Sequence, residues 1–240
     1  MEDFFKRGHF SIDYREEAKR ICDLHVDKLA IVTLVYLLIS VVVIIIDNLT
    51  GTTEVIYDIE IRNTWFNGVF TLICGGPLGI SFAYIAKNIQ NGIEPKISDL
   101  LTGFKEFTKA FVLNLLITIF TALWTILLIV PGIIKGLSYS MAYYVAIDTD
   151  MTPNECIKES QRIMQGHKWD YFCLLLSYFG WIFLSVLTCG ILFIWVLPRI
   201  NQASYLFYLD ITGLGLQQEI DAKTVQIEES DVEPAAGQFY

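Results

Sequence analysis

The stretch that decides the fold is LLIVPGIIKGLSYSMAYYVAID, residues 127–148. A Pro131-Gly132 pair and Lys135 interrupt an apolar run that begins at Phe111. One unbroken helix of about 37 residues would be about 55 Å long, nearly twice the roughly 30 Å thickness of a bilayer's hydrocarbon core. We therefore interpret Pro131-Gly132 as a turn between two membrane spans.

The composition of the chain supports insertion in a membrane. Of its 240 residues 54% are hydrophobic and only 18% are charged, whereas a soluble domain usually has roughly 25% charged residues. The net charge of −9 argues against nucleic acid as a partner, because phosphate binding requires a basic surface. We expect much of the surface to contact membrane lipids instead.

Apolar segments of the length that a transmembrane helix needs, roughly 17–25 residues, recur along the chain. We predict six of them, and hence an all-α fold: a polytopic membrane helical bundle. The predicted spans are residues 29–46, 65–86, 111–130, 132–147, 171–188 and 191–209. The chain then divides into a cytoplasmic amphipathic N-terminal segment (1–28), a six-span membrane domain (29–210) and an acidic cytoplasmic tail (211–240), which we expect to be disordered.

The distribution of Lys and Arg predicts the orientation in the membrane. Fourteen of these residues lie in the N-terminal segment, the connections 87–110 and 148–168, and the tail, whereas the opposite side has only Arg62 and Lys135. We therefore predict a plasma-membrane protein with both termini in the cytoplasm. Because the first 28 residues lack an apolar signal region, we expect the first span to act as its own insertion signal.

The outer loop between the first two predicted spans is acidic. Within it the sequence TEVIYDIEI, residues 53–61, alternates weakly between apolar and polar side chains. Alternation with a period of two is typical of a strand. The loop therefore predicts a small hairpin.

Three cytoplasmic segments resemble one another and precede the first, third and fifth spans. Each places apolar side chains at the i, i+3, i+4, i+7 spacing of one helix face. The returning spans share a proline followed by a tyrosine, and we predict helix breaks or hinges at Pro77, Pro131, Gly132 and Pro198. Three repeats of an amphipathic helix and a membrane hairpin explain this pattern, although apolar segments also resemble each other by composition alone.

The amphipathic segments are the predicted contacts with anionic lipid of the inner leaflet. In the alternative interpretation, their apolar faces dock on the helix bundle, and both can hold at once. Residues predicted at the membrane interface are Lys28, Lys109, His167, Lys168 and Trp169, where a lysine stem stays apolar while its charge reaches the headgroups. A protein partner is a further possibility at these helices or at the acidic tail.

No signature of a hydrolase, a metal site or a nucleotide-binding loop is present. The three histidines are dispersed, and the five cysteines are odd in number and form no CxxC pair. This pattern predicts neither a disulfide framework nor a zinc site. We expect no enzyme activity, no metal and no cofactor.

Polar side chains within the predicted spans are the remaining candidates for function. The possible polar intramembrane cluster consists of Arg199, Asn201, Gln202, Asn114 and Asn67. A charge at the bilayer centre costs at least roughly 2.5–3.5 kcal/mol, so we expect Arg199 to face the bundle interior and to have partners. The set is either a polar lining for a substrate or ion path, or a group of hydrogen bonds between helices.

Residues 130–208 resemble a bacterial integral membrane family labelled Domain of Unknown Function 975. The motifs in common are Pro-Gly-Ile-Ile-Lys, Tyr-Ser-Met, Ser-x-x-x-Met-x-Gly-His-Lys-Trp, Gly-Trp and a late proline, in this order. The late proline is followed by Arg199, where the family pattern has tyrosine. The resemblance implies a multi-pass bacterial membrane protein and brings no catalytic residues.

Two functions remain open on the sequence. The first is a non-enzymatic membrane module that organises lipids or partner proteins through its cytoplasmic helices and tail. The second is a small transporter or channel-like protein with a polar pathway near Arg199, because repeated units and intramembrane polar residues are typical of transporters. A water-filled cavity at Arg199 would favour transport, and a packed helix interface would favour the first function.

Overall fold

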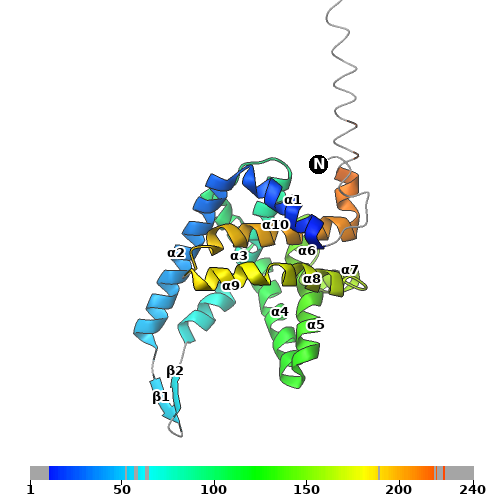
Figure 1. Ribbon diagram of the computed structural model, residues 1–240. Coiled ribbons are helices and arrows are strands. Elements are labelled where there is room, and N and C mark those ends of the chain that lie inside the picture. Colours follow the sequence, from blue (N-terminus) through cyan, green and yellow to red (C-terminus); the bar gives the residue numbers. More distant parts are fainter. Residues whose placement is uncertain are drawn as a thin grey trace, which may run out of the picture.

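The computed structural model describes residues 11–51, 53–56, 59–62, 65–188, 190–218, 220 and 224. This part of the chain is mostly helical, as predicted (Figure 1). Its elements are α1 (Ser11–Asp23), α2 (Val26–Thr50), β1 (Thr53–Ile56), β2 (Ile59–Arg62), α3 (Trp65–Gln90), the 3-10 helix η2 (Ile97–Phe104), α4 (Phe107–Leu127), α5 (Ile129–Tyr139), α6 (Ala142–Asp148), α7 (Pro153–Ile163), α8 (Lys168–Ser177), α9 (Phe179–Leu187) and α10 (Phe193–Thr212). The strands β1 and β2 pair antiparallel and confirm the small hairpin in the outer loop. Most of the acidic tail lies outside the described residues.

Four stretches are long and apolar enough to cross a membrane. They are Val26–Thr50, Trp65–Gln90, Phe107–Leu127 and Lys168–Leu187, and they coincide with the predicted first, second, third and fifth spans. The predicted fourth span is divided into α5 and α6, each shorter than the roughly 20 residues that a crossing needs. The predicted sixth span is α10, whose polar side chains include Arg199 and Asp210.

The turn between α4 and α5 lies at Leu128, not at Pro131-Gly132 as predicted. Leu128 has an extended backbone, with φ −160° and ψ 135°, between the end of α4 and the start of α5. Pro131 lies in the first turn of α5. The backbone N–H that proline lacks would have no hydrogen-bond partner within the helix at this position. A Cβ on Gly132 would lie 2.4 Å from the Oγ1 atom of Thr125, so this glycine allows the two helices to approach closely.

The predicted breaks at Pro77 and Pro198 are also wrong. Pro77 lies inside α3 and Pro198 inside α10, and both helices continue on either side. Both prolines are buried. Surrounding protein can compensate for the backbone hydrogen bond that a proline removes, which explains why these helices do not end there.

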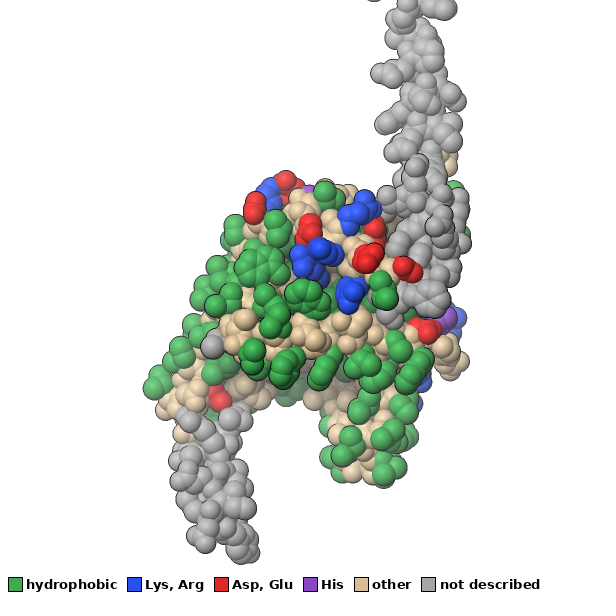
Figure 2. Space-filling model, in the orientation of Figure 1, with side chains coloured by type: hydrophobic (Ala, Val, Ile, Leu, Met, Phe, Trp, Pro, Cys, Tyr) green, Lys and Arg blue, Asp and Glu red, His purple; other side chains and the backbone are tan. Residues whose placement is uncertain are grey.

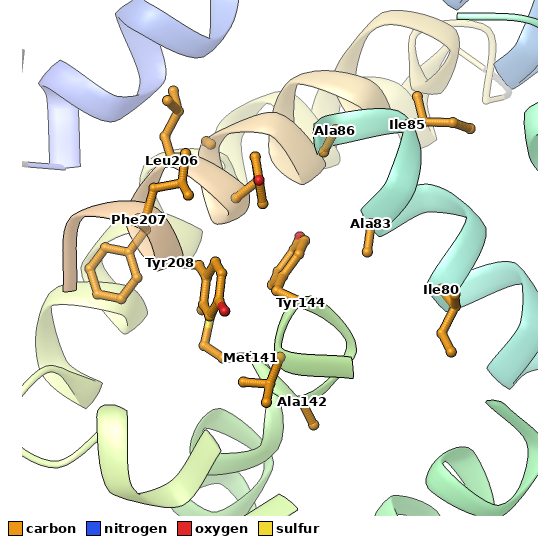
Figure 3. Close-up of a cluster of buried hydrophobic side chains, with 14 of the residues drawn as sticks. Ile80, Ala83, Ile85, Ala86, Met141, Ala142, Tyr144, Leu206, Phe207 and Tyr208 are labelled. Carbon is orange, nitrogen blue, oxygen red and sulfur yellow. The ribbon is translucent and has the colours of Figure 1, made fainter. Parts of the chain in front are cut away.

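The helix α10 is the centre of the fold. It packs against α1, α2, α3, α8 and α9, and the side chains from Gln202 to Leu209 are all buried. Figure 3 shows part of this core: Leu206, Phe207 and Tyr208 lie near Met141, which precedes α6, near Tyr144 of α6 and near the alanines of α3. The C-terminal half of α10 is covered on all sides, which is typical of a protein interior.

The three amphipathic segments dock on this bundle through their apolar faces. The helix α1 packs on α10 and α8, η2 packs on α3, and α7 packs on α4, α5 and α6. Each segment has a buried small residue in its contact face: Ala18, Gly103 and Ser160. The apolar faces of α1 and α7 are therefore covered by protein, as in the second interpretation above. The middle segment is a 3-10 helix that buries Leu100 and Gly103 but leaves Ile97 and Leu101 exposed, so both interpretations hold for it.

Close approach is tightest at Gly103. A Cβ there would lie 1.9 Å from the carbonyl oxygen of Pro77. The Gly103 amide donates a hydrogen bond to the Oγ atom of Ser81 (2.9 Å), which itself donates to the carbonyl of Leu100 (2.8 Å). The corresponding contact of α7 is a 2.8 Å hydrogen bond from the Ser160 hydroxyl to the carbonyl of Ser138.

Apolar side chains cover most of the outer surface. Figure 2 shows Lys, Arg, Asp and Glu gathered at the end where α1 lies, and hydrophobic side chains over the sides and over the tip of the α4–α5 hairpin. At that tip Ile126 is 84% exposed and Ile129 is 71% exposed. Apolar surface of this extent on a soluble monomer would be unusual, so the surface fits contact with lipid.

Substitution of Gly103 by alanine is expected to destabilise the fold, because the new methyl group has no room beside the Pro77 carbonyl. Forced overpacking typically costs about 1–3 kcal/mol. The matched control is Gly68→Ala in α3, where no atom lies within 4 Å of the added Cβ. Thermal unfolding of each purified variant in detergent measures its stability. Equal melting temperatures for the two variants would contradict the close docking of η2.

Candidate functional site

Arg199 has its partner at the charged end of the molecule. Its guanidinium donates a 2.7 Å hydrogen bond to the Oδ1 atom of Asp23, the last residue of α1, and its side chain is 24% exposed. The carbonyl of Arg199 accepts a bond from the Tyr178 hydroxyl at 3.4 Å. Arg199 is thus paired, as expected, and the pair joins α10 to α1.

Asn201 connects three helices by hydrogen bonds. Its side-chain NH₂ group donates to the carbonyl of Phe82 in α3 at 2.6 Å, and its Oδ1 atom accepts from the Tyr144 hydroxyl at 3.0 Å. Figure 3 shows Tyr144 of α6 in the space between α10 and α3. Both polar groups of the Asn201 side chain therefore have partners inside the bundle.

Gln202 faces a different helix surface from Asn201. Its Nε2 atom donates to the Oε1 atom of Gln90 at 3.1 Å, and both residues are buried. The Oε1 atom of Gln202 has no hydrogen-bond partner within the described residues. This pair links α10 to the C-terminal end of α3.

The two remaining asparagines lie away from α10. The Asn114 side chain donates to the carbonyl of Leu72 at 3.0 Å and accepts from the Tyr143 hydroxyl at 2.9 Å. The backbone amide of Asn67 donates to the Oδ1 atom of Asp47 at 3.1 Å, which joins the start of α3 to the end of α2. The five predicted polar residues thus occupy separate places and mostly connect helices.

The residues predicted at the membrane interface have different environments. Lys109 donates to the carbonyls of Ala146 and Thr149, at 2.9 and 3.0 Å, and so binds the C-terminal end of α6, where a cation is favourable. Lys28 forms an ion pair with Glu94, and this hydrogen bond lowers the pKa of the Glu94 carboxyl. Trp169 is 71% exposed.

Lys168 is half-buried at the start of α8, next to His167. His167 is exposed, and its Nδ1 atom lies 3.7 Å from a carboxylate oxygen of Asp170. The exposed positions of His167 and Trp169 fit a place at the lipid headgroups.

Two connections were not found from the sequence. Lys87 of α3 pairs with Asp148 at the end of α6 at 2.7 Å, and the Tyr14 hydroxyl donates to Asp210 near the end of α10. The sequence does show Asp148 and Asp210 near the ends of returning helices. Their partners could not be inferred, because each partner lies far away in the chain.

The described cysteines, Cys22, Cys74, Cys156 and Cys173, are free thiols. Burial raises the pKa of Cys22 to about 12, so its thiol stays protonated and is a poor nucleophile at neutral pH. Among the described residues no group of three or more His, Cys, Asp or Glu side chains is arranged to hold a metal ion.

Two cavities adjoin along α3. One, of about 280 Å³, lies between α2, α3, α6 and α10 and includes Tyr144 and Asn201 in its lining. The other, of about 340 Å³, lies between α2 and α3. They share Tyr36, Gly79 and Phe82, and Arg199 lines neither. A third cavity, of about 510 Å³, is more polar and lies between α6, α7 and α10.

A double-mutant cycle tests the bond between Asn201 and Tyr144. Asn201→Ala removes the 3.0 Å acceptor of the Tyr144 hydroxyl, which keeps only a 3.3 Å bond to the carbonyl of residue 201, and it leaves the Phe82 carbonyl without its donor. Loss of such buried partners typically costs about 1–3 kcal/mol. With Tyr144→Phe added, we expect a coupling free energy of about 0.6 kcal/mol or more. Unfolding in detergent gives the four stabilities, and Asn201→Ala with the exposed Val41→Ala serves as the additive control. Additivity in both cycles would contradict the bond.

Comparison with known proteins identifies one family. Residues 125–215 match the family described as "Protein of unknown function (DUF975)". No curated protein and no solved structure matches the chain. The matched segment runs from the end of α4 through α10 and includes Tyr144, Arg199 and Asn201. Over residues 125–215, the chain is therefore similar to the DUF975 family of proteins of unknown function.

Proposed function

We propose that this chain is a non-enzymatic integral membrane module with six membrane-embedded segments in three repeated hairpins, and that its cytoplasmic face organises lipids or partner proteins. The observation that carries the proposal is the docking of three amphipathic segments on returning helices of the bundle. Docked in this way, they make a fixed, charged face above an apolar body (Figure 2).

The order of docking supports three equivalent units. The segment η2, which opens the second unit, packs on α3 of the first unit, and α7, which opens the third, packs on α5 and α6 of the second. The helix α1, which opens the first unit, packs on α10 of the third. Neighbourhood in the chain accounts for η2 on α3 and for α7 on α6, but it does not account for α1 on α10, which a triplicated unit closed into a ring predicts.

Basic side chains on the docked segments support contact with anionic lipid. Lys19 of α1, Lys105 after η2 and Lys158 of α7 are all exposed. A basic residue near an anionic leaflet contributes about 1 kcal/mol of attraction. With this face in the cytoplasm, the excess of Lys and Arg also follows the positive-inside rule.

The environment of Arg199 favours this function over transport. A transport pathway at Arg199 requires an open polar cavity beside its charge, but the guanidinium is bound to Asp23 and lines neither cavity along α3. The polar residues of α10 are held by bonds between helices. These contacts support a structural role for them.

Thiol labelling in intact cells tests the orientation. In a variant whose native cysteines are replaced, we expect Thr50→Cys, which is exposed at the end of α2, to react with a membrane-impermeant maleimide added from outside. Lys158→Cys is expected to react only after the cells are permeabilised, because the positive-inside rule places α7 in the cytoplasm. Outside labelling of Lys158→Cys would overturn the proposed orientation.

Neutralisation of the basic face tests the proposed activity. The triple variant Lys19→Gln, Lys105→Gln, Lys158→Gln is expected to reduce the enrichment of phosphatidylglycerol around the protein at least about fivefold, since each lysine contributes attraction to the anionic leaflet. Lipid composition around the protein in mixed phosphatidylethanolamine and phosphatidylglycerol nanodiscs measures this enrichment. Lys135→Gln, in the α4–α5 hairpin, is the control and should change nothing. Unchanged enrichment in the triple variant would contradict a lipid-organising face.

A further inference from the structure

We propose that the two adjoining cavities along α3 form one lateral groove that holds an acyl chain of an inner-leaflet glycerophospholipid. This inference deepens the proposed function and rests on it, because it requires the chain to be inserted in a membrane. It names a lipid class and a binding site distinct from the charged face that carries Lys19, Lys105 and Lys158.

The length of the groove fits an acyl chain. Its lining on α3 extends from Asn67 to Ala83, about 24 Å at 1.5 Å per residue. One leaflet contributes about 15 Å of a hydrocarbon core that is roughly 30 Å thick. The two cavities meet at Tyr36 and Phe82, whose rings pack edge to face with centroids 5.0 Å apart. A chain that fills one leaflet therefore fits along this face of α3.

The volume of the groove is too small for a helix. Cavities of about 280 and 340 Å³ are too small for an α-helix, which is about 10 Å wide with its side chains. A single extended hydrocarbon chain is the thin occupant that a bilayer supplies. It would restore the dispersion contacts that the lining of an empty apolar cavity lacks.

The chemistry of the walls also favours a neutral, apolar occupant. No Asp, Glu, Lys or Arg lines either cavity. Several polar side chains in the walls are bonded to protein: Ser40 donates to the Tyr36 carbonyl at 3.0 Å, Ser204 donates to the Ile200 carbonyl at 2.9 Å, and Asn201 has the two partners given above. The walls thus offer little to a charged or sugar-like ligand.

The polar end of the groove lies at the depth of the lipid ester groups. Asn201 bonds to the carbonyl of Phe82, five residues before Lys87 in α3, which is about 7 Å along the helix axis. Lys87 pairs with Asp148 at the charged end of the bundle. The interfacial region of a bilayer is about 5–7 Å deep on each side of the hydrocarbon core. A lipid seated here would place its glycerol esters near Asn201 and Tyr144.

Two neighbouring positions on α2 provide a matched test. Ser40 lines the groove and is half-buried, whereas Val41 is 50% exposed and lines neither cavity. The full chain is purified from nanodiscs of phosphatidylethanolamine and phosphatidylglycerol, and native mass spectrometry measures the lipid that is retained. Wild type and Val41→Trp are expected to keep one glycerophospholipid. In Ser40→Trp we expect the dissociation constant of this lipid to rise about tenfold, and the retained amount to fall accordingly.

The smaller substitution Ser40→Leu is a control for misfolding. It should also reduce lipid retention, while the melting temperature stays near that of wild type. Equal retention in all variants, no lipid in wild type, or a retained second copy of the chain instead of lipid would overturn the groove. Failure here leaves the labelling and anionic-lipid results untouched, so the groove and the proposed function fail separately.

Discussion

The burial of α10 is the constraint on which the rest of the structure depends. The C-terminal half of α10 is buried, where an unpaired polar side chain is costly. Bonds to other helices therefore stabilise most of its polar groups, although the Oε1 atom of Gln202 has no partner within the described residues. Asn201 fixes α6 and α3, and Arg199 fixes α1. The helices that bury α10 therefore also supply the partners of its polar side chains.

Docked amphipathic segments give the molecule its polarity. The apolar faces of α1 and α7 pack against the helix bundle, and charged side chains gather at one end of the molecule (Figure 2). Small residues such as Gly103 and Ser160 allow this docking because hydrogen bonds and backbone contacts replace side-chain volume. A lipid-organising face and a lateral groove are compatible in such a molecule, since one uses headgroup charge and the other the hydrocarbon interior.

Prediction from the sequence succeeded where a single segment carries the signal. Hydropathy and length predicted α2, α3, α4 and the α8–α9 stretch because twenty apolar residues are a local property. It failed where the outcome depends on neighbours. Pro77 and Pro198 lie in uninterrupted helices because surrounding protein covers the backbone there, and Pro131 starts a helix because the chain had already turned at Leu128.

By itself the sequence determined that the chain is mostly helical and rich in lipid-length apolar segments, that its basic residues are segregated, and that residues 125–215 resemble DUF975 proteins. Only the tertiary structure decided what the polar residues do. Arg199 meets Asp23 and Gln202 meets Gln90 across more than a hundred positions, and no local periodicity contains such a pairing. The cavities along α3 likewise depend on the tertiary structure, because a cavity forms only where helices pack against one another.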